Sequence, residues 1–354
     1  MLTQFYLHCH MKDKLHFDCD YMQLAHPLIL KRLEEMAGHS ITGYGRDAVC
    51  DEAKHKIREA CGCPDAEVQF LVGGTQTNAV MLDVLAAPYE GIVAAHTGHI
   101  AVHEAGAIEA TGHKVIELPA HDAKLDAAEV DHYLTTFFRD DSWDHMVIPG
   151  MVYITHPTEY GTLYSLKELE DIAAVCHRHN LKLYLDGARL GYGLAATGTD
   201  VTLKDIARLC DAFYIGGTKV GAMIGEAVVI PNANLVHNLF TQIKRHGALL
   251  AKGWLLGVQF DTLFTDNLYF KISRHAILMA EKLKEGLLKK GYKPTIDSPT
   301  NQQFLIFTDE QVEKLSKFTT FSIWEKLDGG LNVVRLATAW YTDEKDVDRL
   351  LEEM

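Results

Sequence analysis

Three polar segments, each following a short apolar run, contain the side chains best suited to chemistry. Asp186 and Arg189 lie in "DGAR" after "LYL", Lys219 ends "GGTK" after "FYI", and residues 73–78 form "GGTQTN" after "VQFLV". A lysine amine can form a Schiff base, a carboxylate can keep a pyridine nitrogen protonated, and a glycine-rich turn at a helix start can bind phosphate. Pyridoxal phosphate (PLP) needs these three groups. The competing interpretations are an ordinary Asp186–Arg189 ion pair and a surface cation at Lys219.

A parallel sheet would bring these segments together. Short apolar runs alternate with helix-period segments between residues 66 and 230, and residues 99–110 read as one helix. The clearest unit spans 151–186: a strand, a helix with Ser165 and Glu168 at capping-box spacing, a stop at Asn180 and a second strand. Strand, helix and strand at this length indicate a parallel pair, and ligands bind at the carboxyl ends of such strands.

The remainder of the chain has a different pattern. A long amphipathic helix is predicted for residues 268–290, followed by "QQFLIFT", another helix, "NVVRLAT" and a terminal helix. We therefore expect an N-terminal arm at 1–35, a large α/β domain at 36–250 and a smaller C-terminal α+β domain at 251–354.

Several motifs together resemble one known family. "LDGAR" and "GGTK" are joined by "YGRD" (44–47), "GHIAVHEAGAIEATGHKV" (98–115), "HGALLAKG" (246–253) and "VVRLAT" (333–338). The chain thereby resembles fold-type I PLP-dependent enzymes, and more narrowly the low-specificity L-threonine aldolases and their β-eliminating-lyase relatives. The resemblance implies an α/β large domain like that of aspartate aminotransferase, with a mainly parallel sheet. It also implies a homodimer or homotetramer with shared active sites.

The resemblance assigns roles to individual residues. Lys219 would hold PLP, Asp186 would pair with the pyridine nitrogen, and His99 would stack on the ring. The phosphate would be held by Gly74, Thr75, Asn78 and Thr218. The substrate carboxylate would be gripped by Arg189, which also lies at the cofactor, and by Arg335. Tyr44 and Lys252 would reach a neighbouring subunit's site. Cys19, in "FDCDY", replaces a serine that helps many aldolases hold the carboxylate, and a thiol is the weaker hydrogen-bond partner.

The expected reaction is retro-aldol cleavage of a β-hydroxy-α-amino acid such as L-threonine or L-allo-threonine. The base that takes the β-hydroxyl proton would be His99, His156 or a water held between them. β-Elimination and racemisation use the same cofactor and stay open as alternatives. A third interpretation is a nucleotide-binding protein using "GYGLAA" (191–196) with Asp211, or a PLP-fold protein that only binds or regulates.

Composition limits the function classes. The 354 residues are 47% hydrophobic and carry a net charge of −14, which argues against a uniformly basic nucleic-acid surface. No apolar run reaches the roughly 20 residues of a membrane span, and we expect no signal peptide. The seven scattered cysteines favour reduced thiols in the cytoplasm. Two histidine pairs, in "HCH" (8–10) and at His99 and His103, could suggest a metal, but ordinary solvated histidines are favoured and no metal is expected.

Overall fold

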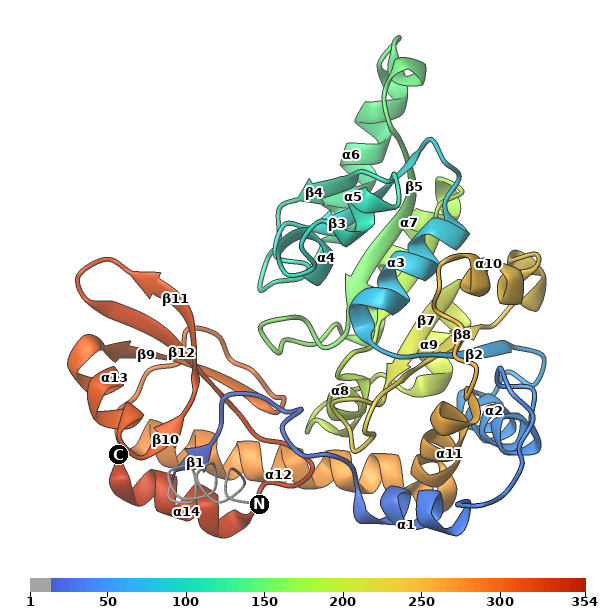
Figure 1. Ribbon diagram of the computed structural model, residues 1–354. Coiled ribbons are helices and arrows are strands. Elements are labelled where there is room, and N and C mark those ends of the chain that lie inside the picture. The colour runs from blue at the N-terminus through green and yellow to red at the C-terminus, as the bar shows by residue number, and fades with distance from the viewer. Residues whose placement is uncertain (1–13) are drawn as a thin grey trace.

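A seven-stranded sheet forms the centre of the molecule (Figure 1), in a computed structural model that describes residues 14–354. The "HCH" pair therefore lies outside the described residues. The strands, in their order across the sheet, are β2 (Glu67–Leu71), β8 (Glu226–Ile230), β7 (Ala212–Gly216), β6 (Lys182–Asp186), β5 (Ile148–Thr155), β3 (Glu90–Ala95) and β4 (Val115–Leu118).

The strand directions confirm the mainly parallel sheet. β4, β3, β5, β6 and β7 pair in parallel, and β8 runs antiparallel to both of its neighbours, β7 and β2. The inner strands are buried along most of their length, which explains why they read as continuous apolar runs and not as alternating ones.

Helices cover both faces of this sheet. The larger core lies between the sheet and α1 (Pro27–Glu35), α2 (Ala48–Cys61), α6 (Ala127–Arg139), α7 (Leu166–Arg178), α8 (Leu190–Ala195), α9 (Leu203–Leu209) and α11 (Trp254–Leu263). The opposite face carries α3 (Gly74–Leu85), α4 (His99–Val102), α5 (Ala107–Ala110) and α10 (Leu239–Arg245). The short 3-10 helices are η1 (Trp143–His145), η2 (Ala233–Leu235) and η3 (Thr265–Asn267).

Local signals set the bounds of α7 as predicted. Ser165 and Glu168 make both hydrogen bonds of the capping box, and the chain leaves the helix at Asn180 with a φ of 58°. The single helix predicted for residues 99–110 is wrong. Ala105 and Gly106 adopt left-handed φ values of 51° and 73°, so the segment divides into α4 and α5.

A smaller unit stands beside the sheet (Figure 1). It contains a three-stranded antiparallel sheet of β11 (Ser322–Leu327), β12 (Leu331–Ala337) and β9 (Gln302–Thr308), with α13 (Asp309–Ser316) and α14 (Glu344–Glu353). The N-terminal arm joins this unit, since β1 (Leu15–His16) pairs in parallel with β10 (Thr319–Thr320).

One long helix, α12 (Leu268–Lys289), connects the two parts. Tyr269 and Ile272 in its first half pack into the large core, whereas Leu283 and Leu287 pack into the core of the small unit. The large core thus continues past residue 251, and the predicted domain bounds stay a prediction.

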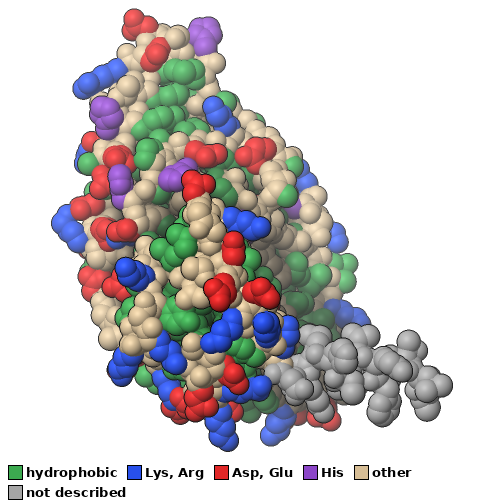
Figure 2. Space-filling view, turned by 90° about the vertical axis from the view of Figure 1, so that its left-hand side faces the viewer, with side chains coloured by type: hydrophobic (Ala, Val, Ile, Leu, Met, Phe, Trp, Pro, Cys, Tyr) green, Lys and Arg blue, Asp and Glu red, His purple; other side chains and the backbone are tan. Residues whose placement is uncertain are grey.

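Two further features concern the charges on the surface and the length of the helices. On the face in Figure 2, acidic and basic side chains are interspersed without a continuous basic area. Within residues 14–354, every helix is too short or too polar to cross a bilayer.

Candidate active site

The three polar segments meet around one pocket at the carboxyl edge of the sheet. Five predicted residues line it, namely Gly74, His99, Asp186, Arg189 and Lys219, and so do Thr155, Thr158, Glu159 and Tyr214. They come from the ends of β5, β6 and β7, from the start of α3 and from α4, which is the placement expected for parallel strands.

Asp186 lies on the floor of this pocket and is 2% exposed. Its carboxylate accepts hydrogen bonds from the Tyr153 hydroxyl at 2.6 Å, the Asn78 amide at 2.9 Å and the Ala188 N–H at 3.0 Å, and also from the Tyr214 hydroxyl. Burial raises the pKa of both tyrosines, and the Asp186 charge raises it further, so both remain protonated donors. The carboxylate is therefore held in one orientation.

Asn78 does not lie where a phosphate ligand would be expected. Its side-chain amide donates to Asp186 and, at 2.7 Å, to Glu104, and its oxygen accepts from the Tyr184 hydroxyl at 3.3 Å. These three bonds engage both amide hydrogens and the carbonyl oxygen, because Asn78 lies a full turn inside α3 and faces the sheet. Its geometry is that of a support for Asp186.

The start of α3 keeps the features of an anion cradle. Gly73 at the N-cap provides no side-chain cap, so the first N–H groups of the helix remain available. A side chain at Gly74 would come within 3.1 Å of the Tyr214 hydroxyl, so a glycine keeps the entrance open. Thr75 is exposed next to this turn. The Thr218 hydroxyl instead accepts the Gly225 N–H at 3.0 Å, inside its own turn.

Lys219 follows β7 in a turn that needs glycine. A Cβ at Gly216 would lie 2.2 Å from the Ala188 carbonyl oxygen. The Tyr192 hydroxyl donates to the Lys219 carbonyl at 2.6 Å, while no hydrogen bond to the lysine amine occurs among the residues that the structure describes. Burial lowers the pKa of this amine, and Arg189 lowers it further. A neutral amine is the nucleophilic form.

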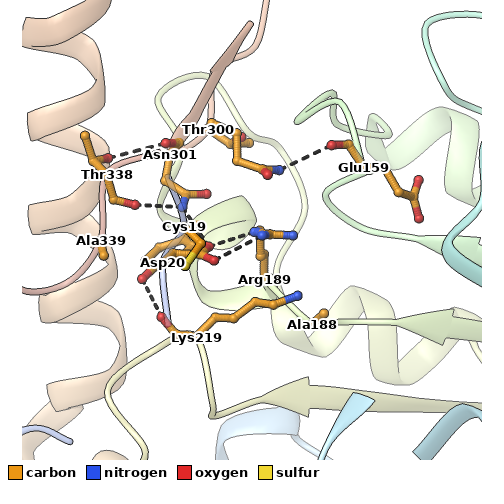
Figure 3. A network of polar contacts seen from close by, with 12 residues as sticks. Cys19, Asp20, Glu159, Ala188, Arg189, Lys219, Thr300, Asn301, Thr338 and Ala339 are labelled. Atoms are coloured by element: carbon orange, nitrogen blue, oxygen red, sulfur yellow. Dashed lines mark hydrogen bonds and ion pairs between the residues drawn. The ribbon is translucent and has the colours of Figure 1, made fainter. Parts of the chain in front are cut away.

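Arg189 is already paired with Asp20 (Figure 3). Its Nε and Nη2 donate to the two Asp20 oxygens at 2.7 and 3.0 Å, and Asn301 donates to the same carboxylate at 2.9 Å. Burial raises the pKa of Asp20, but Arg189 and Lys219 outweigh it and hold the pKa below its usual value. The two guanidinium donors of Arg189 that were predicted to bind a substrate carboxylate therefore bind Asp20 of the N-terminal arm.

Arg335 is a buried guanidinium without a carboxylate partner among the described residues. It donates to the Gln302 side chain, the Asp18 carbonyl and the Ser322 hydroxyl, lies 4.9 Å from the Trp324 ring, and leaves Nε unpartnered. Burial and Arg189 lower its pKa. A buried cation with neutral partners and a free donor favours an anionic ligand.

Cys19 lies in the arm directly before Asp20, beside this charged group (Figure 3). Its thiol is half-buried, and burial raises its pKa, with the neighbouring carboxylates of Asp18 and Asp20 adding to the effect. The thiol therefore stays protonated near neutral pH and can act only as a weak donor or acceptor.

His99 forms one wall of the pocket. Its Nδ1 lies 2.7 Å from the Glu104 carboxylate, and its backbone N–H donates to Glu159 at 2.8 Å. The His103 ring lies 5.6 Å away and tilted, and no group of three or more potential metal ligands occurs within residues 14–354.

His156, one of the predicted bases, does not line the pocket. The imidazole is fully buried, both of its nitrogens lack partners, and its ring is 6.4 Å from that of Tyr164. Burial lowers its pKa to about 4, and the charges that act on it are Asp200, Lys124 and Glu168, none of which lines the pocket. Its side chain has turned into the core behind β5.

Tyr44 and Lys252 lie together on an exposed surface away from this pocket. The Tyr44 N–H donates to the Ala251 carbonyl at 2.9 Å, and Tyr44 adopts a left-handed φ of 62°. Neither residue lines the pocket of its own chain. Their role toward a neighbouring subunit stays a prediction.

The "GYGLAA" interpretation is wrong. These residues form most of α8 and its C-cap, and they pack tightly: a Cβ on Gly191 would lie 2.4 Å from the Ser273 hydroxyl, and one on Gly193 would lie 2.9 Å from Pro157. Asp211 accepts the Leu183 N–H at 2.8 Å between two strands. The glycines serve packing, and Asp211 serves the sheet.

Comparison with known proteins places this pocket in a family. Residues 29–309 match the family described as Beta-eliminating lyase. The chain belongs to the beta-eliminating lyase family. This lyase is 44% identical to a solved threonine aldolase from Leishmania major, with a TM-score of 0.92 over 96% of this chain and 98% of that one. It is 28% identical over 328 residues to a low specificity L-threonine aldolase from Pseudomonas aeruginosa, which is 91% of each chain.

More distant likeness concerns the fold alone. Aspartate aminotransferase from Thermus thermophilus is 16% identical, with a TM-score of 0.70 over 96% of the lyase and 91% of the aminotransferase. The predicted family resemblance and the aspartate aminotransferase-like fold are both confirmed.

Among the pocket residues that the sequence analysis did not predict, two have titratable side chains, Tyr214 and Glu159. Tyr214 lies inside an apolar strand, where only its contact with Asp186 reveals its role. Glu159 follows β5 in "THPTEY", and the rule that singled out the ends of β6 and β7 applies equally to this strand end. In that segment, the role of the base was assigned from the sequence to His156, and Glu159 was not considered.

Proposed function

We propose that this lyase uses PLP to cleave β-hydroxy-α-amino acids, L-threonine or L-allo-threonine, into glycine and an aldehyde. The observation that carries the proposal is the meeting of Lys219, Asp186 and the start of α3 around one pocket. The similarity of this lyase to threonine aldolases along nearly the whole chain supports the proposed class of substrate.

The residues present fit PLP. Lys219 offers an amine without a described hydrogen bond, Asp186 offers an oriented carboxylate, and α3 offers uncapped N–H groups beside Gly74. These groups match the aldehyde, the pyridine nitrogen and the phosphate of the cofactor respectively. When bound, PLP supplies an electron sink for the bond that breaks at Cα.

Four further side chains would bind the substrate, hold the N-terminal arm and support the cofactor ring. Arg335 would bind the substrate carboxylate, because it is the buried guanidinium with a free donor and no carboxylate beside it. Arg189 and Asp20 would neutralise each other and tie the arm to the pocket. His99 would form the wall against which the cofactor ring lies, its ring held by Glu104.

The same proposal includes the oligomeric state of the protein and its location in the cell. Two copies would place Tyr44 and Lys252 of each beside the other's pocket, giving a homodimer or homotetramer with shared sites. A cytoplasmic location agrees with the free thiols of the described cysteines.

The substrate panel tests the reaction. The chain is incubated with PLP and L-threonine, L-allo-threonine, L-serine or L-cysteine. Glycine plus an aldehyde supports the aldolase, pyruvate plus ammonia would instead indicate β-elimination, and a D-amino acid would indicate racemisation. The Lys219→Ala variant should lose both cleavage and the visible absorbance of bound PLP. A wild-type chain that takes up no PLP would refute the proposal.

A further inference from the structure

We propose that the Glu159 carboxylate is the base that takes the β-hydroxyl proton of the substrate. This inference rests on the proposed aldol cleavage and adds the group that this reaction needs. Glu159 comes from the loop after β5 and lines the same pocket as Lys219 and Arg189, with only 6% of its surface exposed.

Two hydrogen bonds orient the carboxylate. Its Oε1 accepts the His99 N–H at 2.8 Å and the Thr155 hydroxyl at 2.7 Å. The Glu159 backbone carbonyl accepts from the Gln302 amide at 3.4 Å, which links the loop to the small unit. The structure gives Oε2 no hydrogen bond from the residues it describes. One oxygen is thus held, and the other is available to a ligand in the pocket.

The surroundings suit a base that works near neutral pH. Burial raises the pKa of the Glu159 carboxyl, with the Thr155 hydroxyl acting in the opposite direction. The titratable groups facing it from neighbouring elements are His99 on α4, Asp186 on β6, Tyr153 on β5 and, near the loop itself, Tyr160 and Tyr164. A carboxyl with a raised pKa removes a proton more effectively than one with an ordinary pKa.

The other titratable groups of the pocket are already committed. Asp186 is held by four donors. The ring of His99 is assigned to stacking on the cofactor in the proposed function, and its Nδ1 is engaged by Glu104. Lys219 is the amine that binds the cofactor, and His156 faces the core. Glu159 is the pocket carboxylate that these roles leave unused.

The step balances without an added reagent. The β-hydroxyl O–H bond breaks and its proton passes to Glu159 Oε2. The freed oxygen pair forms the aldehyde carbonyl as the Cα–Cβ bond breaks, and the pair of that bond stays at Cα, where the cofactor supplies the electron sink. A proton from water or the Lys219 amine then completes glycine, and Glu159 passes its own proton to water to restore the carboxylate and replace the proton that was used.

The test compares two reactions that differ in their need for this base. Cleavage of L-threonine needs the hydroxyl proton removed, whereas exchange of the glycine Cα proton in D₂O does not. Glu159→Gln should lower the kcat of cleavage by about 100-fold or more, while exchange and the equilibrium binding of glycine stay within about threefold of wild type. The acid limb of the cleavage pH profile should also disappear.

Two further variants serve as controls. Glu117→Gln makes the same change at an exposed position of strand β4, where no hydrogen bond or ion pair to the described residues is lost, and it should leave both reactions unchanged. Glu159→Asp keeps the charge but shortens the side chain, and it should lower cleavage selectively even if Glu159→Gln fails to fold.

Equal losses of cleavage and glycine exchange, or no loss in Glu159→Gln, would overturn the inference and leave the aldolase intact. A wild-type chain that binds and exchanges glycine but cleaves no β-hydroxy amino acid would overturn the proposed function, and the inference with it.

Discussion

Replacing Glu226 by glutamine should stabilise the cofactor-free chain at alkaline pH and leave it unchanged in acid. Glu226 begins β8, lies opposite Gly216 and is 4% exposed. Its Oε2 accepts the Gly217 N–H at 3.0 Å, in the turn that carries Lys219. A glutamine oxygen can accept the same hydrogen bond, so the substitution removes the charge and keeps the geometry.

The size of the change in the free energy of unfolding follows from the shifted pKa of the buried Glu226 carboxyl. Burial raises the pKa of Glu226 from its ordinary 4.5 to about 7, despite the opposing effect of the Thr218 hydroxyl and the Lys219 amine. Between these two pH values the folded chain holds a proton that the unfolded chain releases, so the free energy of unfolding falls as the pH rises. The total loss is about 3 kcal/mol by pH 8, and it is absent below pH 4.5.

Thermal unfolding at pH 4.5 and pH 8 measures the difference. At the entropy of unfolding typical of a 354-residue chain, about 3 kcal/mol corresponds to a rise in Tm of about 4 °C for Glu226→Gln at pH 8. Glu117→Gln removes an exposed charge from strand β4 and should show no such pH dependence. A Glu226→Gln chain that melts at or below the wild-type temperature at pH 8 would show that the ionised carboxylate supports the fold, contrary to this reasoning.

Three other substitutions probe the site. His156→Phe should reduce acid sensitivity between pH 6.5 and 4, measured by urea unfolding, because burial lowers the His156 pKa to about 4 and protonation then opposes folding. Asp20→Asn should lower the free energy of unfolding by about 3–5 kcal/mol, since it leaves the largely buried Arg189 without a carboxylate partner, and Asp18→Asn in the same arm should cost far less. Arg335→Lys should raise KM for L-threonine about tenfold or more without changing PLP absorbance, and an unchanged KM would contradict its carboxylate role.

The sequence by itself determined the elements and the principal chemical groups. Apolar runs marked the strands, and the Ser165–Glu168 box marked the start of α7, because these signals depend on residues close together in the chain. Asp186 and Lys219 could be selected because each directly follows a strand, and the ends of parallel strands meet at one edge.

Only the tertiary structure decided how the side chains at that edge are used. Arg189 meets Asp20, 169 positions away in the sequence, and no local pattern encodes that contact. After β5, the predicted residue His156 is buried away from the pocket, whereas Glu159, which the sequence analysis did not select, lines it. The direction of a side chain beyond a strand end depends on backbone angles and on packing against distant segments, and the order of residues alone does not specify these.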